Sequence, residues 1–328
     1  MNWIGQKISL AGWGLRTLAQ FGWPRALTHF AAGVGDELML TAVMRELRLR
    51  GAPPFWVMSR RPELYRDNPD VAAVVPVDQR MVALARRCGA RVVEPVYTVE
   101  DAAGNMRPPP AHMITSLMAT AGITGPVTLK PVLHLSAAEK AAAAAWAGVI
   151  VIQPTVRSAL RPNDLKEWWP DRWQAVVDAL RPAHRIVQVG GENDPLLAGA
   201  EDRRGHAVSL REVAALLGHA RLFLGLESGF MHLARAVDCP GVIVFGGRVS
   251  PAQAGYAGFV NLTRTPACSP CWRYNGCELD RQCLRDISAD EVIAAVKQVL
   301  AAPRAVLPEQ RLEITPAEQQ RIVDALLP

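Results

Sequence analysis

The stretch 221–247 constrains the fold of this chain most strongly, and its sequence is RLFLGLESGFMHLARAVDCPGVIVFGG. Two apolar runs, 222–224 and 242–245, are too short for helices and predict buried strands. Between them, Ser228 is a good N-cap, and Gly229 leaves room for a ligand close to the backbone. A helix that starts there offers unpaired amides and the positive end of its dipole to phosphate. The stretch predicts a strand-turn-helix-strand unit, which is either an ordinary α/β element or a phosphate site.

The same alternation of strands and helices extends over most of the chain, and it predicts an α/β protein with mostly parallel sheets. Because 328 residues exceed the size at which one core usually keeps growing, we expect two similar halves with a cleft between them. The expected units are 1–147, 148–303 and a helical tail, 304–328. The predicted strands, besides the two above, are 26–32, 55–58, 74–77, 91–96, 149–153 and 185–189. The predicted helices, besides the one after Ser228, are 38–50, 112–121, 137–148, 171–180, 209–217, 289–301 and 316–327.

Composition places the chain among ordinary soluble proteins, since 50% of its residues are apolar and 20% are charged. A formal charge of +5 suits an anionic substrate or an acidic membrane surface, but it is too diffuse to indicate nucleic-acid binding. No apolar run has transmembrane length and no signal peptide is evident, so we expect a cytoplasmic protein. The nine tryptophans are an uneven share of the aromatic residues, which is typical of ligand or interface platforms.

Residues 1–25 precede the first predicted strand and combine tryptophans with basic side chains. Such a segment either lies on a membrane surface or against a partner, or it packs on its own domain. The last arrangement is the more common one. Contact with the inner face of the inner membrane therefore stays an open expectation.

Gly33, Gly35 and Asp36 follow the first predicted strand and invite a dinucleotide-binding interpretation. That interpretation fails because Leu38 occupies the place of the third glycine, and no acid follows at the required distance. Alternatively, the glycines clear space for a substrate, and Asp36 faces the cleft as a general base whose pKa the helix dipole lowers. Asp36 is otherwise a first-turn aspartate without a chemical role.

Four cysteines, Cys268, Cys271, Cys277 and Cys283, lie within one short segment. In a cytoplasmic protein such cysteines are thiols or metal ligands rather than disulfides. Four thiolates suit a tetrahedral zinc or iron ion, and a site closed by four protein ligands is structural rather than catalytic. The alternative is four thiols without a metal.

In combination these motifs resemble glycosyltransferase family 9, the ADP-heptose:lipopolysaccharide heptosyltransferases. The resemblance rests on Gly33-Val34-Gly35-Asp36 with its helix, on Lys166-Glu167-Trp168-Trp169-Pro170, and on LFLGLESGFMHLARAV leading to VIVFGG. They occur in the family's order and at its approximate spacing, and they cover most of residues 26–300. The cysteine segment is similar to the iron-bound structural finger of the autotransporter heptosyltransferases.

The resemblance implies a GT-B fold, with two Rossmann-like domains that hold the acceptor and the nucleotide-sugar respectively. It implies an inverting transfer in which Asp36 deprotonates the acceptor hydroxyl and Lys166 balances the leaving diphosphate, without a catalytic divalent metal. The implied donor is ADP-heptose, and the acceptor is a glycan, a lipid-linked molecule or a protein. Oligomeric state does not follow from the sequence.

The residues that the resemblance assigns fall on both sides of the expected cleft. Gly33 and Gly35 belong to the acceptor side. The donor side comprises Thr155, Lys166, Glu192, Glu227, Ser228, Gly229 and His232. The family usually has aspartate in place of Glu227. The contact of this residue with the donor sugar is therefore open to rearrangement relative to the family. Two other hypotheses remain: a nucleotide-sugar epimerase or hydrolase of the same fold, and a non-catalytic binding module clipped by a metal.

Overall fold

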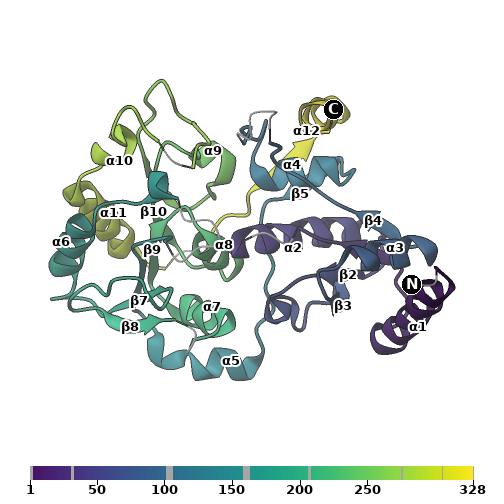
Figure 1. The fold of residues 1–328 in the computed structure, drawn as a ribbon. Coiled ribbons are helices and arrows are strands. Elements are labelled where there is room, and N and C mark those ends of the chain that lie inside the picture. The colour runs from purple at the N-terminus through teal and green to yellow at the C-terminus, as the bar shows by residue number, and fades with distance from the viewer. Residues whose placement is uncertain are drawn as a thin grey trace.

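The computed structural model describes residues 3–30, 33–100, 106–157, 163–205, 208–274, 276–304 and 306–327, with side chains from residue 12 onward. Two α/β halves face each other, each with its own parallel sheet (Figure 1). The sheets lie on either side of the expected boundary near Gly148. The alternation of strands and helices in the sequence is thus confirmed. In the described part of the chain, no helix is long and apolar enough to cross a membrane.

The first half contains a four-stranded parallel sheet in the order β3-β2-β1-β4. Apolar clusters cover both of its faces, one beneath α2 and α4 and the other beneath α1 and α3. The strands are β1 (Ala26–Thr28), β2 (Phe55–Met58), β3 (Val71–Val75) and β4 (Arg91–Val93). The helices are α1 (Trp3–Phe21), α2 (Val34–Leu49), α3 (Gln79–Arg87), α4 (Met113–Thr120) and the 3-10 turn Pro62–Tyr65.

The second half contains a six-stranded parallel sheet in the order β11-β10-β9-β6-β7-β8. Its first strand in chain order, β6, lies in the middle, so the connections leave in opposite directions between β6 and β9. The strands are β6 (Ile150–Gln153), β7 (Ile186–Gly190), β8 (Glu201–Arg204), β9 (Leu222–Leu226), β10 (Gly241–Phe245) and β11 (Val260–Thr263). The helices are α5 (Ala137–Ala142), α6 (Pro170–Leu180), α7 (Leu210–His219), α8 (Gly229–Ala236), α9 (Pro251–Ala254), α10 (Gln282–Arg285) and α11 (Ala289–Ala301), with 3-10 turns at Ala144–Trp146 and Asp164–Lys166.

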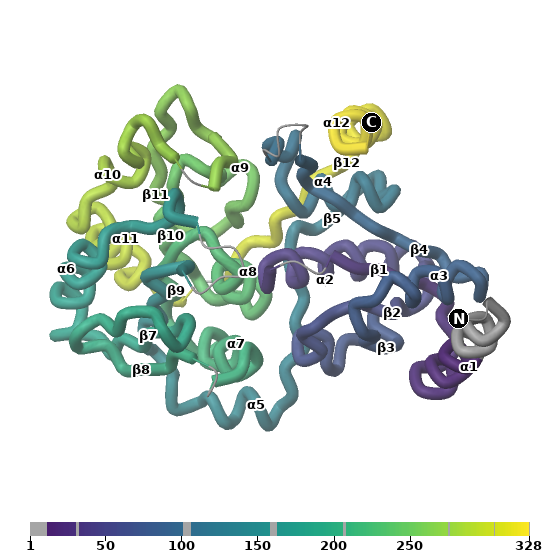
Figure 2. The backbone as a smooth tube through the Cα atoms, in the orientation of Figure 1, coloured from purple at the N-terminus to yellow at the C-terminus, as the bar shows by residue number. Residues whose placement is uncertain are grey.

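The C-terminal tail returns to the first half of the molecule (Figure 2). Its strand β12 (Arg311–Ile314) pairs antiparallel with β5 (Gly125–Thr128). The following helix α12 (Pro316–Leu326) packs on α4. The predicted tail helix is therefore confirmed, and the tail ties the two ends of the chain to the same half.

Several predicted elements are shorter or shifted in the structure, for local reasons. The strand predicted at 91–96 ends at Val93, because Pro95 cannot donate a ladder hydrogen bond. The strand predicted at 74–77 is β3, which ends before Pro76. The helix predicted at 137–148 breaks into α5 and a 3-10 turn, since neither piece buries a side chain and propensity alone does not sustain it.

The strand predicted at 26–32 ends at Thr28, and Ala31 and Ala32 lie outside the described residues.

The two halves touch where α2 packs across α8 (Figure 1). A Cβ on Gly229 would lie 3.0 Å from Val34 Cβ and 3.1 Å from the Gly35 nitrogen. The absence of a side chain at Gly229 therefore lets the first turns of two helices from opposite halves meet. This contact sets the distance across the cleft between the strand ends of the first sheet and those of the second.

Candidate functional site

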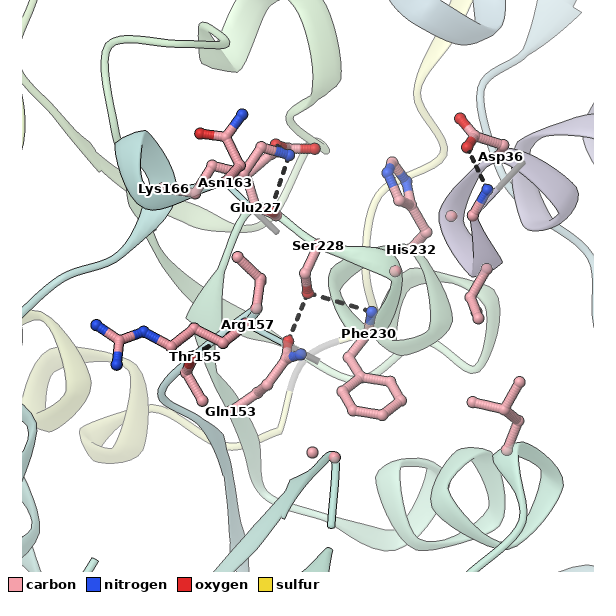
Figure 3. A pocket seen from close by; sticks show the side chains of 18 of the residues that line it. Asp36, Gln153, Thr155, Arg157, Asn163, Lys166, Glu227, Ser228, Phe230 and His232 are labelled. Atoms are coloured by element: carbon pink, nitrogen blue, oxygen red, sulfur yellow. Dashed lines mark hydrogen bonds and ion pairs between the residues drawn. The ribbon is translucent and has the colours of Figure 1, made fainter. Parts of the chain in front are cut away.

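A cavity of about 1320 Å³ lies between the two halves, beside the contact of α2 with α8. It lies at the carboxyl ends of the parallel strands, where open α/β sheets bind their ligands. Every residue that the sequence assigns to the donor or acceptor side lines this one cavity, as Figure 3 shows for the labelled ones. From the first half these are Gly33, Gly35 and Asp36, and from the second half they are Thr155, Lys166, Glu192, Glu227, Ser228, Gly229 and His232.

Asp36 is fixed in the first turn of α2. Its Oδ2 accepts a hydrogen bond from the Gly33 backbone nitrogen at 2.7 Å, and its Oδ1 accepts one from the Tyr97 hydroxyl at 2.9 Å. The side chain therefore caps its own helix and also faces the cleft. Burial raises the pKa of Asp36, and this outweighs the lowering by the two hydrogen bonds and by Lys166. The Gly33 amide at the start of the helix does lower the pKa, as expected, but the partial removal of the carboxylate from water outweighs it, so the net direction is upward rather than downward.

Lys166 and Glu227 form an ion pair on the opposite wall (Figure 3). The lysine ends the 3-10 turn Asp164–Lys166, which the Asn163 side chain caps by accepting from the Leu165 nitrogen at 2.9 Å. Burial would raise the pKa of Glu227, but the Lys166 ammonium and other nearby positive groups, including Arg248, lower it below its ordinary value. Glu227 is therefore a permanent anion that holds Lys166 at the cleft.

Ser228 is the N-cap of α8, as the sequence predicts. Its hydroxyl accepts from the Phe230 nitrogen at 3.2 Å and donates to Gln153 Oε1 at 2.5 Å, which connects β9 to the end of β6 (Figure 3). At Gly229, however, the group that approaches the backbone is α2 of the other half, not open space. The glycine thus serves the contact between the halves.

His232 lies beneath Gly35, whose missing Cβ would be 2.7 Å from His232 Cδ2. Its Nδ1 is 2.6 Å from the Tyr256 hydroxyl. Burial lowers the pKa of His232 to about 4, so the ring is neutral at pH 7. It offers packing and a neutral hydrogen-bonding group rather than a positive charge.

Thr155 and Glu192 occupy the loops after β6 and β7. The Thr155 hydroxyl accepts from the Arg157 nitrogen at 3.1 Å, so it orders the loop that follows β6. Glu192 is exposed at the rim of the cavity, where Gly205 allows the β8 end to pass close to it. Thr155 lies next to the point between β6 and β9 where the strand order reverses, and Glu192 follows β7, the neighbour of β6 on its other side.

Several residues that line the cleft were not predicted from the sequence. Tyr97 follows β4, and Trp272 and Tyr274 come from the cysteine segment. Arg248 stacks on both of the latter rings, with its guanidinium carbon 5.0 Å and 4.7 Å from their centroids. The uneven share of tryptophan was the one sequence signal that pointed toward such platforms.

The cysteine segment folds back on the loop that carries Lys166. Cys268 is exposed, and the other three thiols are partly buried. Burial raises the pKa of the Cys283 thiol, and Cys277 and Cys271 raise it further because they are near. Within the described ranges, no three cysteine, histidine or carboxylate side chains gather as metal ligands would. The thiols have the chemistry for zinc or iron, but in this arrangement they do not form a metal site.

Comparison with known proteins agrees with the geometry of the cleft. The model of glycosyltransferase family 9 (heptosyltransferase) matches residues 111–274, which is half of the chain. Lipopolysaccharide heptosyltransferase 3 of Escherichia coli is 33% identical over 109 residues. That match covers 30% of this chain and 31% of the relative, so it spans about a third of the curated protein's length.

Solved structures show the same fold at low identity. The iron-containing dodecameric glycosyltransferase TibC of enterotoxigenic E. coli has a TM-score of 0.63 and 18% identity, covering 84% of this chain and 76% of that one. The E. coli ADP-heptose lipopolysaccharide heptosyltransferase II has a TM-score of 0.62 and 17% identity, covering 86% of this chain and 100% of that one. These likenesses confirm the predicted GT-B fold. With a family model that matches half its length and a cleft built from the predicted residues, the chain belongs to glycosyltransferase family 9.

Proposed function

We propose that this protein is an inverting glycosyltransferase that moves a sugar from a nucleotide donor to an acceptor hydroxyl. The observation that carries the proposal is the placement of Asp36 on one wall of the cleft and of Lys166 on the other. A partly buried carboxylate whose pKa is raised is a stronger base than an ordinary aspartate. A lysine opposite it supplies the positive charge that a diphosphate leaving group requires.

The reaction follows from these two positions. The acceptor oxygen attacks the anomeric carbon from the side of Asp36, and its proton passes to the Asp36 carboxylate. The bond between the anomeric carbon and the phosphate oxygen breaks, and the bonding electrons leave with the diphosphate toward Lys166. Attack and departure on opposite faces invert the anomeric centre. Because Lys166 supplies the countercharge, we expect no catalytic divalent metal and a rate insensitive to EDTA.

We propose that residues 148–303 hold the donor and residues 1–147 hold the acceptor. The second half carries the N-terminus of α8 and the loops after β6 and β7, which suit a nucleotide diphosphate. ADP-heptose is the proposed donor, since TibC was solved with ADP-D-β-D-heptose and heptosyltransferase II is named for ADP-heptose. A panel of nucleotide-sugars in a thermal-shift assay tests the choice, because the true donor stabilises the fold most.

Asp36→Asn tests the assigned base. We expect the transfer rate to fall by about 100- to 10,000-fold, since asparagine keeps the shape but accepts no proton. ADP affinity, measured by calorimetry, stays at the wild-type value because the donor lies on the other wall. Asp78→Asn is the matched control, since Asp78 caps α3 outside the cleft. A wild-type transfer rate in Asp36→Asn would show that Asp36 is not the base. Turnover of the donor without any acceptor would indicate an epimerase or hydrolase instead.

We propose a structural iron or zinc ion at Cys268, Cys271, Cys277 and Cys283. Support comes from the four thiols in one segment and from TibC, which is described as iron-containing, and a bound ion would have to draw the thiols into a closer set than the structure shows. Elemental analysis of untagged protein is expected to find about one metal ion per chain. Replacement of the four cysteines by serine removes the metal, whereas Cys88→Ser keeps it. Wild-type protein without stoichiometric metal would refute the site.

We propose peripheral membrane contact through the N-terminal segment, at the cytoplasmic face of the inner membrane. No aspartate or glutamate precedes Asp36 in the sequence, and α1 packs on the first half through Trp13 and Phe21. Its outer side leaves Leu15 70% exposed, and the residue Trp23 beyond it is 65% exposed. Co-sedimentation with anionic vesicles tests the contact, with neutral vesicles and a Leu15→Ser/Trp23→Ser variant as controls. Equal recovery with both vesicle types would contradict it.

A further inference from the structure

Tyr97 holds the Asp36 carboxylate from the side opposite its helix. The tyrosine lies in the loop after β4, and its hydroxyl donates to Asp36 Oδ1 at 2.9 Å. Because the Gly33 nitrogen donates to the other oxygen, both carboxylate oxygens have a fixed donor. Burial and the Asp36 charge raise the pKa of Tyr97 well above 10, so the hydroxyl keeps its proton and remains a donor.

Two aromatic rings hold the ring of Tyr97 in turn. Phe30, from the same half, meets it edge-on with the centroids 5.3 Å apart and the planes at 69°. Trp272, from the other half, meets it edge-on at 6.1 Å and 60°. Both distances fall in the range where edge-to-face aromatic pairs are favourable. The tyrosine that contacts Asp36 therefore depends on both sides of the cleft.

Trp272 is itself firmly placed by the second half. It is 2% exposed, and its indole nitrogen donates to Gln253 Oε1 at 3.1 Å. Its backbone nitrogen donates to the Arg248 carbonyl at 3.1 Å, and the Arg248 guanidinium covers the ring. Such contacts leave the indole little freedom to move relative to its own half. The position of the indole relative to Tyr97 therefore depends on the position of the second half relative to the first.

We infer that Tyr97 is the positioning residue for the Asp36 base and that Trp272, from the opposite half, holds the ring of Tyr97 in place. The Asp36 carboxylate then takes its working position only when the two halves face each other. This inference rests on the proposed transferase function. It assigns to the cysteine segment a part in the reaction through Trp272 rather than through its thiols. A base that is ordered by the donor-binding half couples proton removal to donor binding.

Four groups from the two halves act on the pKa of Asp36, and two of them are charged. Tyr97 and the Gly33 amide belong to the first half, and Lys166 and Glu227 face it across the cleft. The Tyr97 and Gly33 hydrogen bonds and Lys166 lower the pKa of Asp36, whereas Glu227 raises it. Loss of the Tyr97 hydroxyl removes one of the lowering contributions. The pKa of Asp36 then moves further upward.

Tyr97→Phe keeps the aromatic contacts and removes the hydroxyl. The acid limb of the kcat/KM profile is expected to move to higher pH, because transfer requires ionised Asp36. ADP affinity is expected to stay unchanged. Tyr65→Phe is the matched control: Tyr65 donates to Glu37 Oε2 at 3.2 Å, one residue further along α2, and Glu37 does not line the cleft. The acid limb of the control stays at its wild-type position.

Trp272→Leu removes the contact from the opposite half and keeps the Tyr97 hydroxyl. We expect kcat to fall by about tenfold, because a base that moves by a fraction of an ångström loses much of its effect. Trp272→Phe restores an edge-to-face contact and is expected to recover most of that loss. If the phenylalanine variant is as slow as the leucine variant while its urea midpoint matches the wild type, the aromatic contact is not what positions Tyr97.

A measurement without turnover separates this inference from the proposed function. Titration of ¹³C-carboxyl-labelled aspartates by NMR follows Asp36 directly, with the Asp36→Asn spectrum assigning its signal. An upward shift of the Asp36 pKa in Tyr97→Phe and a changed titration in Trp272→Leu support the inference even if no donor is turned over. A titration identical to the wild type in both variants overturns it, even in a fully active transferase.

Discussion

The two walls of the cleft differ in chemistry. The first half lines the cleft with Asp36 and with aromatic and thioether side chains, which are Phe30, Met39, Tyr97, Met106 and Met113, and its polar lining is limited to Arg61, Glu63 and Thr98 among the described residues. The wall of the second half is polar and charged, with Gln153, Thr155, Arg157, Asn163, Lys166, Glu227, Ser228 and Arg248. One wall thus suits the removal of a proton, and the other suits the charge of a nucleotide diphosphate.

The difference is sharpest for the two buried carboxylates. Burial is the largest influence on the pKa of both. At Asp36 it prevails and raises the pKa, whereas at Glu227 the charge and hydrogen bond of Lys166, together with His232 and Arg248, outweigh it and lower the pKa. Carboxylates whose environments push their pKa values apart take different roles in catalysis. We assign proton transfer to Asp36 and the binding of a cation to Glu227. Substitutions on each wall should therefore separate catalysis from donor affinity.

On the wall of the second half, which we propose binds the donor and call the donor wall, Lys166→Gln is the substitution with the largest expected effect. It removes the countercharge for the leaving diphosphate and leaves the buried Glu227 anion without its main partner. We expect kcat/KM to fall by about 100- to 1,000-fold, with weaker ADP binding by calorimetry. Asp36→Asn keeps ADP affinity, so the pair of variants tests the division between the walls. Unchanged ADP affinity in Lys166→Gln would contradict the assignment of Lys166 to the diphosphate.

Gly229→Ala tests the distance between the walls. The added Cβ would lie 3.0 Å from Val34 Cβ and 3.1 Å from the Gly35 nitrogen, so α2 and α8 must move apart. We expect kcat to fall by about tenfold, because even a shift of a few tenths of an ångström between α2 and α8 disturbs the alignment of groups on opposite walls, while ADP affinity is kept. Gly218→Ala is the control, since its Cβ meets nothing within 4 Å and it lies in α7. A wild-type kcat in Gly229→Ala would show that the walls adjust freely.

The donor wall was predictable from the sequence because its signals are local. The apolar runs at 222–224 and 242–245 became β9 and β10, and Ser228 caps α8 between them. Each of these signals depends on residues within a few positions of one another. The strand order then places the ends of these elements at the reversal point of the sheet.

The opposite wall was predicted less well, because its contacts join distant parts of the chain. Tyr97 follows a short strand without a motif of its own, and Trp272 reaches it from the cysteine segment in the other half. The edge strand β8, with the sequence EDRR, was missed for a related reason. It is largely exposed and pairs with β7 alone, so it carries no apolar alternation. The direction of the Asp36 pKa shift could not be predicted from the sequence either, because it depends on burial, which is a property of the tertiary structure.

Glu227→Asp tests how the donor wall holds its cation. Aspartate is shorter by one methylene, so it keeps the charge but moves it away from Lys166. We expect the KM for the nucleotide-sugar to rise about fivefold, equivalent to about 1 kcal/mol, while kcat changes little. Steady-state kinetics with two nucleotide-sugars shows whether donor preference changes too. A fall in kcat larger than the rise in KM would mean that Glu227 takes part in the chemistry.

Arg211→Met is expected to leave both walls nearly unchanged and to weaken the connection between the halves. The Arg211 guanidinium is buried, donates to both oxygens of Glu139 at 2.5 and 2.6 Å, and donates to the Glu63 carbonyl of the first half at 3.0 Å. Its removal takes the charged donor from both Glu139 oxygens, which leaves Glu139 with the Ser136 nitrogen at 2.8 Å and Arg66 at 3.7 Å, and it takes the donor from the Glu63 carbonyl. We expect a loss of about 2 kcal/mol in the free energy of unfolding by urea titration, with kcat within about twofold of wild type.

The pH dependence of this loss identifies its cause. The hydrogen bonds and charge of Arg211, with smaller contributions from hydrogen bonds to Ser136, lower the pKa of Glu139 from its ordinary 4.5 to about 2. A carboxyl whose pKa is lowered by folding stabilises the protein above its unfolded pKa, and this contribution disappears as the pH falls toward the folded value. The stability difference between wild type and Arg211→Met should therefore be full above pH 4.5 and shrink between 4.5 and about 2. A difference that persists undiminished at the acid end would assign the loss to the backbone acceptors rather than to Glu139.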